Sequence, residues 1–277
     1  MLPLGGARSV GLLIGRLAHR VVPREREKAL RNLSLALPEL SDDARSRIAR
    51  SVFLNLGRSL LEICWLPKLD EATLRTTTTI EGLEHFQAAV DRGRGVVLFT
   101  GHCGNWEWMA SAIGLLGFRM NVIARESYDP RLNDFIVASR AAQSVKTIGR
   151  GSASSAREIL QTLKNGDVLG VLIDQNIKAE NVMVPFFGRP APTPIGPAKL
   201  AIRSGAAVIA GFIEFQDGKQ CIRFQQPIFP TRSDDPAALT ATLTAAIEKQ
   251  IRHAPEQWVW MHERWKARKG HLPSPEM

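Results

Sequence analysis

Apolar side chains recur at helical spacing through the first part of the chain. Ser41, followed by Asp42 and Asp43, is a favourable N-cap and opens the run SDDARSRIARSVFLNLGRSLLEICWL. Apolar residues then recur at intervals that keep them on one side of a helix, at Ile48, Val52, Phe53, Leu56, Leu60, Leu61 and Ile63. Residues 1–68 are therefore predicted to be mostly helical.

Further along, the pattern changes to short apolar runs that alternate with helical stretches. The runs are VVLFT, MNVIA, VKTI, VLGVLI and AAVIAGFIEF, and the helical stretches lie near residues 109–116, 131–143, 154–165 and 197–204. Three of the runs are apolar without a break, which is typical of strands covered on both faces. The pattern predicts an α/β fold with a mainly parallel central sheet flanked by helices, preceded by an N-terminal helical extension.

The chain is expected to hold one α/β domain over residues 69–277, preceded by the helical region of residues 1–68. Near its end, KQCIRFQQPIFP is predicted to form an antiparallel edge strand, and a helix should follow over about residues 236–253. The chain has 277 residues, of which 44% are hydrophobic, so it is long enough to bury a full core.

The stretch SVGLLIGRLAHRVVP at residues 9–23 is apolar but is interrupted by Arg16, His19 and Arg20. It falls short of the roughly 18 apolar residues that a spanning helix needs, and it lacks the order of a secretory signal. Two interpretations stay open. It is either a short basic amphipathic helix that lies in a bilayer interface or a helix that packs on its own domain.

The charge of the chain favours an anionic partner. Its 36 Lys and Arg against 27 Asp and Glu give a net charge of +9, and seven of the basic residues fall within residues 1–31. Nucleic acid, a membrane surface and an acidic protein all fit this charge. The three cysteines, Cys64, Cys103 and Cys221, lie far apart and form no CxxC pair, which is typical of a protein in a reducing cytosol.

Residues 101–108, GHCGNWEW, follow directly on VVLFT and bring a histidine and a glutamate to a strand-to-helix transition. In one uniform helix, His102 and Glu107 would point about 140° apart and could not meet. Gly101 and Gly104 permit an irregular turn, which would place His102 at the end of the strand and Glu107 in the next helix. A carboxylate on one imidazole nitrogen would leave the other nitrogen to take a proton from a substrate hydroxyl.

This position favours a binding site, because ligands of open α/β sheets bind outside the carboxyl ends of the strands. Backbone N–H groups near Gly104 would then stabilise an oxyanion. The competing interpretations are a purely structural turn, a Cys103 nucleophile and a zinc site. Sequence neighbours such as His102 and Cys103 seldom face each other, and no HExxH motif or Cys-rich cluster supplies a third zinc ligand. No metal or cofactor is expected.

Several stretches occur in an order that is typical of one family. They are GHCGNWE with its HxxxxE spacing, VLIDQN at residues 171–176, VPFFGRPAPTPIGPAKLAIRSGAAVIAGF at residues 184–212 and APEQWVWMHERWK at residues 254–266. Together with REREKALRNLSLALPELSDDARSRIARSVFLNLGRSLLE near the N-terminus, they resemble the bacterial lysophospholipid and lipid A biosynthesis acyltransferases. The resemblance extends over about residues 20–269.

This resemblance implies transfer of a fatty acyl group from an acyl carrier protein or CoA thioester to a hydroxyl of a glycolipid such as a lipid A precursor. In that reaction His102 is the base and Glu107 its orienting partner. The resemblance also implies a location at the cytoplasmic face of the cell inner membrane. Attachment should be peripheral or monotopic, because the apolar N-terminal stretch is short and broken by charge. An acidic carrier protein and a phosphorylated lipid both suit the basic surface, whereas nucleic acid is not an expected partner.

Further residues near the same sheet edge are expected to contact substrate: Gly104, Asn105, Arg125, Asp174, Gln175, Arg189 and Thr193. Arg125 follows MNVIA and offers a guanidinium fork to an acceptor phosphate. Asp174 ends VLGVLI and should face the same cleft. The resemblance implies that Arg189 and Thr193 border the substrate groove. The plain alternatives are a solvated arginine, an Asx-type turn and a proline-stiffened loop.

Aromatic and basic residues interleave in WVWMHERWKARKG near the end of the chain. Trp258, Trp260 and Trp265 either form an interfacial belt on an anionic leaflet or pack in the core.

Two other functions stay open. One is acylation of another lysolipid or of a mannosylated phosphoinositide, since the same motifs serve several acceptors. The other is a basic membrane- or nucleic-acid-binding protein without enzymatic activity, for which the charge is adequate. Against that second function, the aromatic and basic residues interleave only in the last segment.

Overall fold

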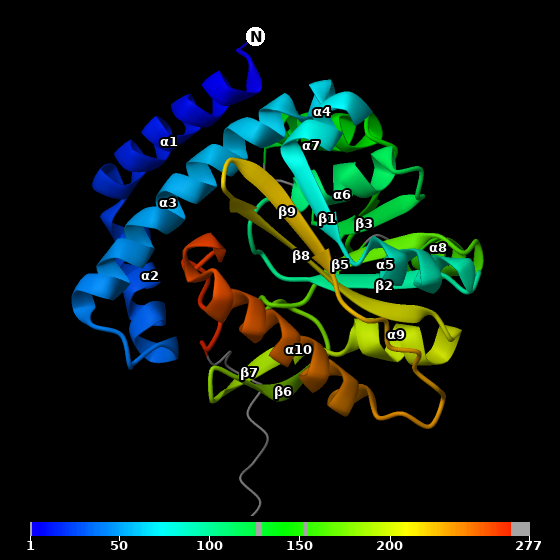
Figure 1. The fold of residues 1–277 in the computed structure, drawn as a ribbon. Helices are drawn as coiled ribbons and strands as arrows, with labels where there is room; N and C mark the ends of the chain where they lie inside the picture. The colour runs from blue at the N-terminus through cyan, green and yellow to red at the C-terminus, as the bar shows by residue number, and fades with distance from the viewer. Residues whose placement is uncertain (1, 126–128, 152–153, 267–277) are drawn as a thin grey trace, which may run out of the picture.

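A computed structural model describes residues 2–125, 129–151 and 154–266 (Figure 1). Three helices come first, α1 (Leu4–Val21), α2 (Pro23–Ala36) and α3 (Asp42–Trp65). The Ser41 hydroxyl accepts a hydrogen bond from the Ala44 N–H at 3.2 Å, which is the N-cap expected for α3. The predicted helical N-terminal region is therefore confirmed over its described residues.

Strands and helices alternate beyond η1 (Leu66–Lys68) and α4 (Glu71–Thr77). In chain order they are β1 (Thr78–Glu81), α5 (Leu83–Asp91), β2 (Val96–Thr100), α6 (Trp106–Leu115), β3 (Met120–Ala124), α7 (Pro130–Ala141), β4 (Val145–Gly149), α8 (Ser155–Lys164) and β5 (Val168–Leu172). There follow β6 (Asn181–Phe186), β7 (Arg189–Pro194), α9 (Gly196–Ser204), β8 (Ala207–Gln216), β9 (Lys219–Phe224), α10 (Pro236–His253) and η2 (Pro255–Gln257).

The central sheet has seven strands in the order β1-β9-β8-β2-β5-β3-β4. Its five strands from β8 to β4 are mutually parallel, so the predicted α/β fold with a mainly parallel sheet is confirmed. Strand β9 pairs antiparallel with β8, as predicted. The prediction that β9 is an edge strand is wrong, because β1 pairs along its other side.

A separate two-stranded hairpin replaces the stiff loop predicted at FFGRPAPTP. Strands β6 and β7 pair antiparallel from Phe186 and Arg189 at the turn to Asn181 and Pro194 at the far end. Phe187 and Gly188 form the turn with φ values of +53° and +69°. A ribbon of only two strands tolerates the prolines, because each strand keeps one edge on which no N–H is needed.

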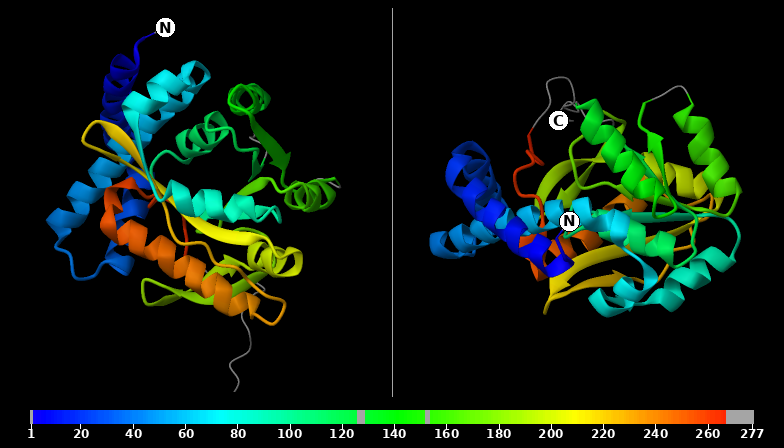
Figure 2. Two further views of the ribbon diagram at one scale, coloured as in Figure 1. Left: turned by 45° about the vertical axis from the view of Figure 1, so that its right-hand side comes forward. Right: turned by 90° about the horizontal axis from the view of Figure 1, so that it is seen from above.

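Two apolar clusters cover opposite faces of the central sheet. Alternate residues of β2 divide between them, since Val96 and Leu98 join the cluster with α5 and α6, while Val97 and Phe99 join the cluster with α8, α9 and α10. Figure 2 shows helices on both faces of the sheet. Ala29 of α2 and Val52 of α3 belong to the second cluster, so the N-terminal helices share a core with the α/β part.

Helices α1, α2 and α3 lie together on one side of the molecule in both figures. Helix α1 packs closely on α3 because both carry glycines at the contact. A Cβ on Gly11 would lie 2.5 Å from the Gly57 carbonyl oxygen. A neighbouring side of α1 exposes a stripe of apolar side chains, which we call the α1 stripe: Val10, Leu13, Ile14, Leu17 and Val21. Across the described ranges, none of the helices is both long and apolar enough to span a membrane.

Candidate active site

The loop between β2 and α6 lies at the carboxyl ends of the parallel strands. Thr100 ends β2 and pairs in register with Leu172, the last residue of β5. His102 and Asp174 each stand two residues beyond these strand ends, and their side chains meet there. Gly104 has a φ of +58°, and a Cβ on it would lie 2.9 Å from the Ile213 carbonyl carbon. The tight turn therefore requires glycine at this position.

Asp174 holds His102 through two contacts. Its Oδ1 lies 2.7 Å from His102 Nδ1, and its Oδ2 accepts a hydrogen bond from the His102 backbone N–H, also at 2.7 Å. The indole Nε1–H of Trp258 donates to the same Oδ2 at 2.7 Å. The Asp174 side chain is fully buried, whereas that of His102 keeps 21% of its surface exposed. Three donors thus fix a buried carboxylate against an accessible imidazole.

The ionisation of Asp174 determines how the imidazole is protonated. Burial by itself raises the pKa of Asp174, but the charge and hydrogen bonds of His102 and the hydrogen bond from Trp258 outweigh burial and lower the pKa to about 2. An ionised carboxylate only accepts hydrogen bonds, so the proton of a neutral His102 resides on Nδ1. Nε2 then carries the free lone pair that a general base needs.

The predicted pairing of Glu107 with His102 is corrected by the structure. Glu107 lies in the first turn of α6 and accepts hydrogen bonds from Arg140 of α7, with Nε at 2.8 Å and Nη2 at 2.6 Å. A guanidinium fork satisfies both carboxylate oxygens, so Glu107 is turned toward α7. The side of the imidazole toward α6 is occupied by Trp106, whose ring meets it edge to face at a centroid distance of 4.9 Å.

A cavity of about 760 Å³ opens beside His102. Its polar part includes Arg125, Arg140, Arg150, Lys178 and Gln175. Its apolar part descends between the sheet and α6, and its walls include Leu98, Met109, Met120, Val122 and Gly170. The cavity therefore presents positive charge near the imidazole and an apolar surface along the sheet. Arg125 and Gln175, two of the predicted substrate contacts, line the same cavity as His102.

The other predicted substrate contacts lie elsewhere. Arg189 is exposed, and its Nε donates to the Leu35 carbonyl at 3.2 Å. Thr193 is fully buried, and its hydroxyl accepts from Arg264 Nη2 at 2.5 Å. Asn105 is buried and caps α6 by accepting from the Trp108 N–H at 3.1 Å. None of these three residues is among those that line the cavity in the described part of the chain.

Two of the N–H groups near Gly104 that were expected to stabilise an oxyanion already donate within the protein. The Gly104 N–H donates to the Gln257 carbonyl at 2.8 Å, and the His102 N–H is bound to Asp174.

Cys103 is buried, and burial together with the nearby charge of Asp174 raises the pKa of its thiol well above the ordinary value. The thiol is thus a poor nucleophile, which agrees with the choice of His102 over Cys103.

The sequence did not indicate that two further residues, Trp258 and Arg140, belong to the site. Trp258 lies far along the chain from His102, and the strand-like bridge between Cys103 and Trp258 brings it back to the loop. Trp258 and Trp260 are buried, so the core interpretation holds for both, while Trp265 is half-buried against Phe186. Arg268 and Lys269 of the proposed belt lie outside the described residues.

Comparison with known proteins finds enzymes that transfer acyl groups. The chain is 28% identical over 217 residues to the phosphatidylinositol mannoside acyltransferase of Mycobacterium tuberculosis (strain CDC 1551 / Oshkosh), which covers 76% of this chain and 68% of that protein. It is 28% identical over 271 residues to the lipid A biosynthesis lauroyltransferase of Escherichia coli K12, covering 96% and 87%. It is 27% identical over 269 residues to the lipid A biosynthesis palmitoleoyltransferase of the same strain, covering 94% and 84%.

All three names specify transfer of an acyl group. The first names phosphatidylinositol mannoside, and the other two name lipid A biosynthesis with different acyl groups. Residues 1–267 match the family described as bacterial lipid A biosynthesis acyltransferase, which is nearly the whole chain. A match of this extent, on a chain with a histidine at the carboxyl edge of a parallel sheet, assigns the activity class: this protein is an acyltransferase and belongs to the bacterial lipid A biosynthesis acyltransferase family.

Proposed function

We propose that this enzyme transfers a fatty acyl chain from a thioester to a hydroxyl of a glycolipid, with His102 as general base and Asp174 as its orienting partner. The observation that carries this proposal is the buried Asp174 carboxylate fixed on His102 Nδ1 at the mouth of a cavity that is cationic at one end and apolar along the sheet. An accessible imidazole beside such a cavity suits a hydroxyl acceptor with a lipid tail.

The chemistry follows from the protonation of the imidazole. His102 Nε2 takes the proton of the acceptor hydroxyl as its oxygen attacks the thioester carbonyl. The tetrahedral intermediate collapses and expels the thiolate, which takes the proton back from His102, so the acceptor becomes an ester and the donor a thiol. Asp174 stabilises the imidazolium that forms between the two steps. No other atom is gained or lost.

Positive charge on the cavity wall supports both binding and the transition state. Arg125, Arg150 and Lys178 line the same cavity as His102, where they favour anionic groups on the substrates and the negative charge that develops on the thioester oxygen. Arg140 is bound by Glu107 and contributes less net charge. This supports a phosphorylated acceptor and an anionic donor, and both acyl carrier protein and CoA thioesters are anionic.

The apolar wall supports a fatty chain as the transferred group. Alternation along the strands turns Leu98, Gly170 and Val122 toward the same face, and the register places these three side by side. Met109 of α6 covers them from the other side. An acyl chain in this groove would place its thioester carbonyl at the strand ends, beside His102.

The surface of the first helix supports peripheral attachment to the cytoplasmic face of the inner membrane. The α1 stripe is exposed, and Arg16, Arg20 and Arg24 are exposed nearby on α1 and α2. Apolar side chains flanked by arginines suit the interface of an anionic leaflet. In this proposal α1 packs on α3 with its glycines and faces the lipid with its stripe.

The acceptor is tested by direct assay, since relatives of equal identity act by name on different glycolipids. Purified protein in detergent is given acyl carrier protein and CoA thioesters of several chain lengths, with a lipid A precursor or a phosphatidylinositol mannoside as acceptor. Mass spectrometry should find one acceptor heavier by one acyl chain with wild type and none with His102→Ala. His85→Ala, which changes a histidine outside the cavity, is the matched control and should retain activity.

No product from either acceptor, with control enzymes active under the same conditions, would overturn the glycolipid assignment. Binding to anionic vesicles or nucleic acid that His102→Ala leaves unchanged, together with no transfer, would instead favour the basic binding protein.

A further inference from the structure

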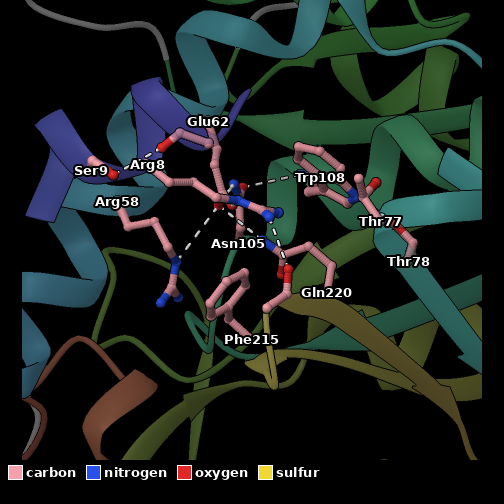
Figure 3. A network of polar contacts seen from close by, with 12 residues as sticks. Arg8, Ser9, Arg58, Glu62, Thr77, Thr78, Asn105, Trp108, Phe215 and Gln220 are labelled. Atoms are coloured by element: carbon pink, nitrogen blue, oxygen red, sulfur yellow. Dashed lines mark hydrogen bonds and ion pairs between the residues drawn. The ribbon is translucent and has the colours of Figure 1, made fainter. Parts of the chain in front are cut away.

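Glu62 of α3 is a fully buried carboxylate that the reaction described above does not use (Figure 3). Its Oε1 accepts a hydrogen bond from Arg8 Nε of α1 at 2.7 Å. Its Oε2 accepts from Asn105 Nδ2 at 3.1 Å and from Gln220 Nε2 of β9 at 2.8 Å. Side chains from the N-terminal helix, the loop after His102 and the antiparallel strand thus meet on one carboxylate.

Stability alone gives little reason for this arrangement. Apolar residues of similar volume usually stabilise a fold as well as a buried ion pair does, because the ions lose their hydration. Arg58, one turn before Glu62, lies 4.0 Å from Oε2, and burial lowers its pKa to about 10, so it stays charged at neutral pH. The chain therefore keeps a costly cluster of charges directly behind the catalytic loop.

Asn105 connects this cluster to the loop. It stands three residues after His102, and its side chain has two roles at once: Nδ2 donates to Glu62, and Oδ1 accepts from the Trp108 N–H at the start of α6. A carboxylate accepts hydrogen bonds only, so Glu62 requires the NH₂ end of the Asn105 amide. The oxygen of the Asn105 amide therefore points toward α6, where it caps the helix.

The first turn of α6 carries two of the side chains that surround the reaction centre. Trp106 packs edge to face on the His102 ring, and Glu107 binds Arg140 at the cavity wall. A rotated Asn105 amide would set an N–H against the Trp108 N–H and displace this turn. The other side of the loop is tied to the C-terminal segment, because Val259 N–H donates to the His102 carbonyl and Gly104 N–H donates to Gln257.

We propose that Glu62 is a positioning residue for the acyl transfer: by fixing the Asn105 amide it sets the start of α6 and the His102 loop, and Arg8 of α1 holds it in place. This inference rests on the proposed function, since its effect is measured on acyl transfer. It makes the N-terminal helices part of the catalytic arrangement as well as the surface that meets the lipid.

The test separates the two roles of Asn105. Asn105→Ser keeps an oxygen that caps the helix but removes the amide that donates to Glu62. Asn105→Asp also keeps a capping oxygen, but it replaces the donor to Glu62 with a second carboxylate, which can only accept hydrogen bonds. The double variant Asn105→Asp/Glu62→Gln restores the pair with the donor and acceptor exchanged. The matched control is Thr78→Val, which removes a buried hydrogen bond of 2.9 Å to Trp108 Nε1 on the same helix without touching the cap.

Asn105→Ser should lower kcat by roughly tenfold to a hundredfold with KM unchanged, because small displacements of catalytic groups have effects of this size. Asn105→Asp should lose more, and the double variant should recover most of the loss. Thr78→Val should lower Tm and leave kcat as in wild type, measured at a temperature at which every variant is folded.

Three results would overturn the proposal: full kcat in Asn105→Ser, equal losses of kcat in Asn105→Ser and Thr78→Val, or a double variant that regains Tm but not kcat. Wild-type transfer that vanishes in His102→Ala tests the proposed function separately. Absence of transfer by the wild-type protein would contradict the proposed function, whereas the three results above would contradict only the positioning role of Glu62.

Discussion

At the scale of single residues, the contacts of a carboxylate, and not its separation from His102 along the chain, decide whether it orients the imidazole. Both Glu107 and Asp174 follow a buried strand closely enough to reach the strand ends. Glu107 is neutralised by Arg140, whereas Asp174 receives three donors, two of them from His102. Only Asp174 can therefore orient the imidazole and stabilise its charged form.

Asp174→Asn should lower kcat by on the order of a thousandfold or more, because an amide can donate to Nδ1 and so favour the wrong tautomer. The measurement is kcat with the donor and acceptor that the acyl-transfer assay selects, accompanied by the circular dichroism spectrum to show that the variant is folded. Near wild-type kcat in a folded Asp174→Asn protein would remove Asp174 from the mechanism.

Asp174 should also make stability depend on acid pH. Its pKa is about 2 in the folded protein against an ordinary value of 3.8. A lowered folded-state pKa stabilises the protein above the ordinary pKa, and this contribution is lost as the pH falls from about 4 to about 2. The loss should be about 2 kcal/mol in the free energy of unfolding.

Urea unfolding of wild type and Asp174→Asn at several pH values measures this contribution. The stability difference between the two proteins should shrink as the pH falls through this window. A difference that does not change with pH would show that Asp174 titrates alike in the folded and unfolded chains.

At the scale of elements, helix α1 combines two faces with different requirements. Its inner face needs glycine, because the backbones of α1 and α3 come within contact distance. Its outer face is apolar and exposed, which a helix that served only to pack on its own domain would not need.

Two glycines of α1 should respond oppositely to alanine. A Cβ on Gly15 would lie 2.8 Å from the Leu54 Cα, so Gly15→Ala should destabilise the protein by about 1–3 kcal/mol through overpacking. Gly5 has open space where a Cβ would stand, so Gly5→Ala should stabilise it by up to about 1 kcal/mol through helix propensity. Denaturant unfolding measures both. Equal effects would contradict the close contact of α1 with α3.

The α1 stripe should carry the attachment to lipid. Leu13 and Leu17 are 62% and 58% exposed, and Leu13→Glu/Leu17→Glu should weaken binding to anionic vesicles by roughly a hundredfold or more, since each buried leucine contributes about 1.5–3 kcal/mol. Leu160→Glu, at a leucine of α8 that is 48% exposed, is the matched control. Vesicle sedimentation measures binding, and salt should weaken it further. Equal binding by both variants would locate the membrane surface elsewhere.

At the scale of the whole molecule, the cavity is a product of three strands and a helix. Strand β2, helix α6 and strand β3 are consecutive in the chain, whereas β5 follows only after α7, β4 and α8. Strands β2, β5 and β3 supply one wall and α6 the other. The terminal methyl of Met120 lies so close to Gly170 that a Cβ there would approach it to 2.5 Å. Met120 pairs with Val168 near the start of β5, so it lies at the end of the apolar groove away from His102.

Met120→Ala should therefore deepen the groove and shift the preferred donor toward longer acyl chains. The measurement is kcat/KM across a series of thioesters of increasing length, and the expected result is a maximum displaced by two or more carbons, about the space that the missing side chain vacates. Met183→Ala, at an exposed methionine of the hairpin, is the control. An unchanged profile in Met120→Ala would mean that the chain does not extend to this point.

The helices, the buried strands and the histidine were predictable because each has a local signal. Ser41 capped α3 as its sequence indicated, and unbroken apolar runs marked β2, β5 and β8. The hairpin at residues 181–194 and the inner position of β9 were not predictable in this way. The prolines of the hairpin are atypical of strands, so its sequence did not indicate them. The inner position of β9 depends on its pairing with β1, a strand of only four residues that lies far earlier in the chain.

The sequence by itself determined the α/β fold, the helical N-terminal region and the position of His102 at the end of a buried strand, because periodicity, capping and motif spacing are properties of neighbouring residues. The tertiary structure alone decided that Asp174 and not Glu107 contacts the imidazole, that Trp258 completes the triad of donors, and that Glu62 stands behind the loop. These contacts join residues 72, 84 and 43 positions apart. Which distant residues meet depends on strand order and helix packing, and no local pattern carries that information.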